Sequence, residues 1–178
     1  VQENASIVIA DGKILKIFTN KTKQENIDVT NAKNDFEAMF APEEVIDGEN
    51  LLWMPGLVDG HMHTGQQLLK GAVLDELPMI WTRIMLPFES TLTPEKLKLS
   101  AQLAALEMIR SGTTAFVDAG SYHMKEAVKV YDQAGLRGTL SFSTMDEKGL
   151  PESIATTTEE AVAQADDFYD FCGEYKRL

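Results

Sequence analysis

The sequence predicts an α/β protein in which a parallel sheet follows a smaller β unit, and three observations carry that prediction. From Leu57 onward, strand-like apolar runs alternate with helical stretches, and this alternation is typical of parallel strands joined by right-handed helical crossovers. Ahead of Pro55 the chain holds only short strand-like runs separated by turns. The chain has 178 residues, 44% of them hydrophobic, which is enough for one substantial core.

The segment before Pro55 is predicted to be a small β unit that carries no chemistry of its own. Four short strands are expected, at residues 5–10, 13–18, 44–47 and 51–54. The first two flank Asp11-Gly12, which is a hairpin turn signal. Residues 35–40 can form a single helical turn in an otherwise polar, irregular stretch.

The segment after Pro55 holds about three strand-helix units. The expected strands cover residues 57–61, 113–117 and 136–143, and the expected helices cover 94–111, 125–134 and 158–175. The first helix has clear boundary signals, because Thr93 is a good N-cap, Pro94 suits the first helical position and Gly112 ends the run. Four apolar residues of that helix recur every three or four positions and predict one buried face: Leu99, Leu103, Leu106 and Ile109.

The overall charge excludes some classes of partner. Twenty-eight acidic residues stand against 16 basic ones, for a net charge of −12, whereas nucleic acid and anionic membranes call for a basic face. Cys172 is the only cysteine, so no disulfide can form within the chain, which fits a reducing compartment. The sequence shows no signal-peptide pattern and no apolar run of membrane-spanning length, and we therefore expect a cytoplasmic protein.

A His-x-His pair is the strongest functional signal. The run MPGLVDGHMHT at residues 54–64 places His61 and His63 at the carboxyl end of an expected strand, where ligands bind in parallel α/β folds. Residues two apart in a strand point to the same side, so the two imidazoles can grip one metal ion. Imidazole suits several metals, and the pair alone does not choose among them.

Three other polar residues are weaker candidates. Asp59 shares the strand face of His61 and can orient a metal ligand from behind, although a structural Asp at a strand end is an equal alternative. Asp118 ends the second expected strand and faces the same rim. His123, the third histidine, is interpreted as an exposed loop residue, with a contact to substrate or to a metal ligand as the alternative.

The run at residues 54–64 resembles the Pro-Gly-hydrophobic-hydrophobic-Asp-x-His-x-His motif of the amidohydrolase superfamily of metal-dependent hydrolases. The resemblance implies a (β/α)₈ barrel with a β-sandwich built from both chain ends. On that basis residues 1–54 are the N-terminal part of the sandwich and residues 55–178 the first part of the barrel. A whole barrel needs about 250 residues, so we expect the later ligands, two His and an Asp, and the general acid/base to lie beyond Leu178.

Later stretches resemble the branch that holds triazine hydrolases, methylthioadenosine/S-adenosylhomocysteine deaminases and guanine deaminase. They are QQLLKG at 66–71, LPMIW at 77–81, LPFE at 86–89, LTPE at 92–95 and EMIRSGTTAFVD at 107–118. The branch implies that Trp81 stacks on a heteroaromatic ring and that Glu89 binds ribose hydroxyls. The competing interpretations are simple packing for Trp81 and a solvated surface charge for Glu89. Lys70 departs from the branch, which commonly has Arg there.

The resemblance therefore implies a hydrolase of carbon–nitrogen bonds, an aminohydrolase acting on a purine, pyrimidine or triazine-like heterocycle. One divalent metal is expected, zinc first and iron as the alternative, to make water a nucleophile near neutral pH. The chain alone is expected to be an inactive portion of a longer enzyme, and homo-oligomers of that enzyme stay open. Two alternatives are a binuclear, dihydroorotase-like cyclic-amide hydrolase and a non-catalytic fragment or binding module.

Overall fold

The computed structural model describes residues 5–19, 40–73, 75 and 78–178. The chain divides into two compact units, residues 1–53 and residues 54–178, and each is described by itself. Most of the helical turn expected at residues 35–40 falls outside the described residues.

The first unit contains a two-stranded antiparallel hairpin of β1 (Ser6–Ala10) and β2 (Lys13–Phe18). Its turn residues Asp11 and Gly12 both have positive φ, 52° and 70°, as a tight hairpin whose twist matches its strands requires. The two strands expected at 44–47 and 51–54 are wrong, since both stretches are irregular. Their apolar side chains are largely exposed, and a strand-like run without a neighbour to pair with gains nothing from extended structure.

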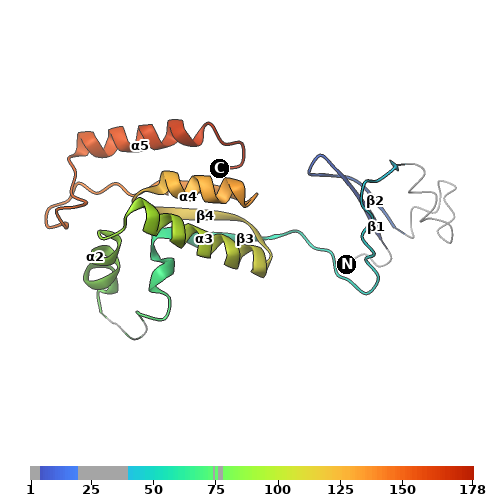
Figure 1. The fold of residues 1–178 in the computed structure, drawn as a ribbon, viewed down its shortest axis with the longest axis horizontal. Helices are drawn as coiled ribbons and strands as arrows, with labels where there is room; N and C mark the ends of the chain where they lie inside the picture. The colour runs from blue at the N-terminus through green and yellow to red at the C-terminus, as the bar shows by residue number, and fades with distance from the viewer. Residues whose placement is uncertain (1–4, 20–39, 74, 76–77) are drawn as a thin grey trace. The chain divides into compact units, whose positions relative to one another are not determined.

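The second unit is built on a parallel three-stranded sheet in the order β3-β4-β5 (Figure 1). The strands are β3 (Leu57–Met62), β4 (Thr113–Ser121) and β5 (Arg137–Phe142). Met62 pairs with Asp118, and Ser121 pairs with Phe142, so the carboxyl ends of all three strands lie at one edge. The mixed α/β fold with a parallel sheet is confirmed, and β4 runs past Asp118, where the prediction ended it.

A helix follows each strand: α3 (Pro94–Ser111), α4 (Met124–Gln133) and α5 (Thr158–Cys172). In Figure 1, α4 lies between α5 and the sheet, and it packs against both α3 and α5. The side chain of Thr93 caps α3, which ends at Gly112 with a φ of 78°. Thr157 and Glu160 form a reciprocal capping box at the start of α5. These helix starts are where the sequence signals put them, and α5 ends three residues earlier than predicted.

The buried face predicted for α3 is wrong. Leu99, Leu106 and Ile109 are 56%, 53% and 54% exposed. The residues of α3 that are buried are mostly small: Leu97, Ser100, Ala101, Ala104, Ala105 and Met108. This face packs on α4 and on the segment that follows β3, and small side chains allow the backbones to approach closely there. The buried face of α3 is therefore the one with small residues, where neighbouring elements lie close, and not the one with the largest apolar side chains.

The described residues of the connection from β3 to α3 form three short helices: η2 (Thr64–Leu69), η3 (Trp81–Met85) and α2 (Leu86–Glu89). η2 packs against α3 and β4, so the residues directly after His63 are held against the core. The largest fully buried apolar side chains of the core are Tyr131, Phe116, Leu97, Met124 and Val128. Among the described residues, no helix has the length and apolar character needed to cross a membrane.

Candidate active site

The rings of His61 and His63 converge at the carboxyl end of β3. Their Nε2 atoms are 3.2 Å apart, and the ring planes meet at 78°. Two nitrogens about 2.0–2.1 Å from one tetrahedral zinc ion lie about 3.3 Å from each other. The separation in the structure therefore matches two ligands of a single ion. His61 is exposed and His63 is half-buried, which leaves the ring nitrogens accessible to solvent.

The described residues supply only part of a metal site. Among them, no group of three or more His, Cys, Asp or Glu side chains is arranged to hold a metal ion. Catalytic zinc generally has three protein ligands and an open position. The donor chemistry and spacing of His61 and His63 fit a divalent metal, and further ligands are needed to complete its shell.

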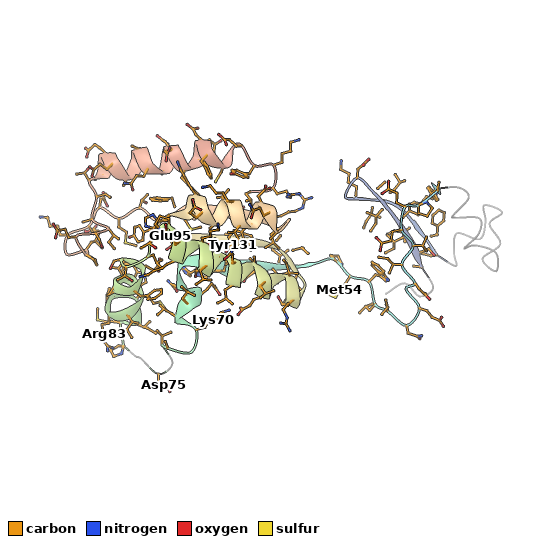
Figure 2. All side chains as sticks on the ribbon, viewed as in Figure 1. Met54, Lys70, Asp75, Arg83, Glu95 and Tyr131 are labelled. Carbon is orange, nitrogen blue, oxygen red and sulfur yellow. The ribbon has the colours of Figure 1, made fainter. Side chains whose placement is uncertain are left out.

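Asp59 contacts the backbone of the histidine pair and not an imidazole ring. Its Oδ1 accepts a hydrogen bond from the backbone N–H of His61 at 3.1 Å. Asp59 also lines an open cavity of about 530 Å³ together with both histidines. The lining also includes residues of α3, among them Glu107, which forms an ion pair with Lys70. Lys70, labelled in Figure 2, thereby ties the end of η2 to α3.

Asp118 is fully buried behind the pair and accepts three hydrogen bonds. Thr64 donates both its backbone N–H, at 3.2 Å, and its hydroxyl to Oδ2. The backbone N–H of Gly120 donates to Oδ1 at 2.9 Å. Burial raises the pKa of the Asp118 carboxyl, and these hydrogen bonds together with nearby His63 oppose that rise. The structure thus places Asp118 in contact with Thr64, the neighbour of His63 in the chain.

Glu89 is buried, with a relative exposure of 6%. Gln66 donates from Nε2 to one carboxylate oxygen at 2.8 Å, and Ser121 donates from Oγ to the other at 2.6 Å. A solvated surface charge is therefore not its state in this structure. Tyr122 lies close enough for Glu89 to help burial raise the pKa of its phenol to about 12. A side chain on Gly65 would collide with Ser121, so this packing requires glycine at that position.

Trp81 and His123 are not brought to the histidine pair. Trp81 begins η3 and is 45% exposed, and it does not line the cavity that contains His61. His123 stands at the start of α4 with a φ of 60°. Its Nε2 lies 3.1 Å from the carbonyl oxygen of Leu92, so this ring connects α4 to the segment before α3.

Several polar residues around the site were not found from the sequence. They are Thr64, Gln66, Ser100, Ser121 and Tyr131. Ser100 offered one signal, because it is a polar residue that falls among alanines on α3. Thr64 offered another, since it directly follows the His-x-His pair. The others are joined to their partners only by the tertiary fold.

Comparison with known proteins finds the same family in sequence and in structure. Residues 52–174 match the amidohydrolase family. The chain is 35% identical over 163 residues to a 5-methylthioadenosine/S-adenosylhomocysteine deaminase of Halothermothrix orenii, covering 85% of this chain and 33% of that protein. An adenosine deaminase from Xanthomonas campestris, solved with bound zinc, is 31% identical with a TM-score of 0.60, covering 70% of this chain and 28% of that one.

A guanine deaminase from C. acetobutylicum, solved with guanine in its active site, shares the fold. Its TM-score is 0.66 at 18% identity, and the match covers 98% of this chain and 38% of that one. The chain thus spans about a third of the length of the proteins that it matches. The sequence match, the parallel sheet and the His-x-His pair at its carboxyl edge agree, and the chain belongs to the amidohydrolase family.

Proposed function

We propose that this chain supplies two metal ligands, His61 and His63, to an aminohydrolase that removes an amino group from a heteroaromatic ring. The observation that carries the proposal is the 3.2 Å separation of the two Nε2 atoms at the carboxyl end of a parallel strand in a member of this family. Deaminases among its relatives support hydrolysis of a carbon–nitrogen bond as the reaction.

One divalent metal fits these two residues, with zinc preferred and iron as the alternative. Zinc is supported by imidazole ligation at this spacing and by the bound zinc of the Xanthomonas relative. When bound, such an ion acts as a Lewis acid that lowers the pKa of water toward neutrality. Residues of this chain hold the backbone of the proposed ligands. Asp59 accepts a hydrogen bond from the backbone N–H of His61, and Asp118 accepts one from the backbone N–H of Thr64, the residue after His63.

The proposed substrate is a small heterocycle, with adenine nucleosides preferred over other purines, pyrimidines and triazines. The names of the relatives that share 30% identity or more support adenosine derivatives. Glu89, oriented by Gln66 and Ser121, is the proposed acceptor for ribose hydroxyls. Trp81 presents an exposed ring that can stack on a flat base. His123 is the weakest substrate contact, because its ring already faces Leu92.

Residues 55–178 are proposed to be the first three strand-helix units of a (β/α)₈ barrel, and residues 1–54 part of a composite β-sandwich. The remaining metal ligands and the general acid/base then lie outside this chain, which would be inactive alone. This division is supported by the lack of a group of three or more possible metal ligands among the described residues and by the coverage of the relatives. A cytoplasmic location and the absence of nucleic-acid or membrane partners stay predictions from composition.

The test is ammonia release from a panel of nucleosides and free bases, together with metal analysis, on the protein in its full natural length. The proposal expects one metal per chain and turnover of an adenine nucleoside, both lost in His61→Ala. His123→Ala is the matched control, because it removes a histidine that faces Leu92 instead of the pair. Two metals per chain with cyclic-amide hydrolysis would favour the binuclear alternative. Metal-free protein without turnover would favour a binding module.

A further inference from the structure

Thr64, the residue after His63, is bound through every polar atom it has. Its N–H and hydroxyl donate to Asp118 of β4, and its carbonyl oxygen accepts from Ser100 Oγ of α3 at 2.6 Å. Its Oγ1 is also 2.6 Å from the hydroxyl of Tyr131 on α4. Thr64, Ser100, Asp118 and Tyr131 all have a relative exposure of 0%. Three elements distant in sequence therefore hold this one residue.

The donors and acceptors of this cluster follow once the carboxyl group of Asp118 is taken as ionised. An ionised carboxylate only accepts, so the hydroxyl of Thr64 donates to Asp118. The lone pairs of Oγ1 are then free, and Tyr131 is the donor to Thr64. Gly120 gives Asp118 a further N–H. All the partners of Asp118 donate, and an Asn in its place would turn an NH₂ group toward a donor.

The cluster lies directly behind the histidine pair. The peptide between His63 and Thr64 is anchored by the hydrogen bond from the Thr64 N–H to Asp118. At the opposite edge of that peptide, the His63 carbonyl oxygen accepts from the N–H of Gln66 at 3.2 Å and from Gln67 Nε2 at 3.1 Å. The backbone that carries the His63 ring is thus held at both ends of one peptide. Tyr131, labelled in Figure 2, reaches this point from the last turn of α4.

We infer that Asp118, Thr64 and Tyr131 are positioning residues: they fix the backbone at His63 and so the distance between the two imidazoles that bind the metal. The inference rests on the proposed metal site. Hydrogen bonds that orient metal ligands are typically worth about 10- to 100-fold in metal affinity. Since this cluster acts on the backbone of a ligand instead of its ring, the lower end, about tenfold, is expected for each variant.

The experiment measures the zinc dissociation constant of the full-length protein by competition with a chromophoric chelator. Asp118→Asn, Thr64→Val and Tyr131→Phe each remove one link of the cluster with little change of shape. Thr64→Ser keeps the hydroxyl and is the rescue variant. Val128→Ala is the control, because it removes buried volume from the helix that carries Tyr131 without removing a hydrogen bond of the cluster. Thermal unfolding of the zinc-free proteins shows how far each variant is destabilised.

The inference expects the three variants to weaken zinc binding by about tenfold, while Thr64→Ser and Val128→Ala stay near the unmodified protein. It is overturned if the three variants weaken zinc no more than Val128→Ala does at comparable stability. It is also overturned if Thr64→Ser and Thr64→Val bind zinc equally. Tyr131→Phe, the mildest change, decides the result if another variant does not fold. His61→Ala separates the two proposals: retained zinc in that variant refutes the site itself, and lost zinc there with unaffected cluster variants refutes the positioning role alone.

Discussion

The histidine pair and the buried cluster behind it are adjacent in the chain but opposite in state. His61 is exposed, and the closest polar contact of its ring is the other histidine. Thr64 and Asp118 are wholly buried, and each is hydrogen-bonded by several partners. In the described part of the chain, no buried side-chain nitrogen or oxygen lacks a partner. The fold thus satisfies the buried polar groups and leaves exposed the imidazoles that are proposed to bind the metal.

The largest expected effect separates the two regions by activity. In the full-length protein, the proposed metal site predicts that replacing His61 or His63 by Ala lowers turnover by about a thousandfold, because a metal supplies several kcal/mol of transition-state stabilisation. For His61→Ala, the free energy of unfolding of the zinc-free protein should change by less than about 0.5 kcal/mol, as for other exposed positions. Steady-state kinetics and urea unfolding measure the two quantities. A large loss of stability would contradict the view that the pair is held by its surroundings and does not itself hold the fold.

A substitution in the buried cluster should instead lower the stability of the fold. Asp118→Ala leaves the buried donors of Thr64 and Gly120 without an acceptor and should cost about 3 kcal/mol of unfolding free energy. Asp59→Ala is the matched control, because that carboxylate accepts a single bond at an exposed position, and its loss should cost about 1 kcal/mol or less. Urea denaturation of the zinc-free proteins compares the two. Equal losses would show that burial of the cluster has no special weight.

The charge of Asp118 predicts a pH dependence of stability. Burial raises its pKa in the folded state above the ordinary value of 3.8, so the folded protein binds this proton more tightly than the unfolded chain. Its contribution to stability is then complete below the unfolded pKa and is lost as the pH rises through the folded pKa. From acid to neutral pH, the unmodified protein should lose stability relative to Asp118→Asn. A difference that stays constant with pH would contradict the raised pKa.

The smallest expected effect comes from a site remote from both regions. Thr157→Ala removes one half of the capping box of α5 and should cost about 1 kcal/mol of unfolding free energy. Zinc affinity should stay unchanged, because neither Thr157 nor Glu160 contacts the cluster. Thermal unfolding and the chelator competition check both expectations. A weakened zinc affinity in this variant would mean that stability alone controls the metal site.

The sequence predicted those features that depend on local spacing. Two residues apart in a strand means the same side of that strand, and this places the imidazoles of His61 and His63 together. The caps at Thr93 and Thr157 are equally local, and both form. The parallel sheet followed from the alternation of strands and helices. The metal-ligand role of the pair stays a prediction.

Features that depend on contacts between distant elements could not be predicted. Asp118 was a candidate without a partner, and its partner Thr64 lies 54 positions away. Tyr131 is 67 positions from Thr64, and no local pattern connects them. The prediction of the buried face of α3 failed for a related reason. Periodicity identifies apolar residues such as Leu106, but it does not identify which neighbouring element the helix packs against. The alanines of that helix are buried instead, because they allow close packing against its neighbours.

The position of β3 has a consequence for handling the protein. Among the described strands it is an outer strand of its sheet, so one row of its backbone N–H and C=O groups has no strand partner. Val58 on β3 is 70% exposed, and the exposed Leu99 and Leu106 of α3 add further apolar surface. Open strand edges and apolar surface promote association between copies. A segment containing only residues 54–178 is therefore expected to self-associate as its concentration rises, and light scattering should accompany any affinity measured on it.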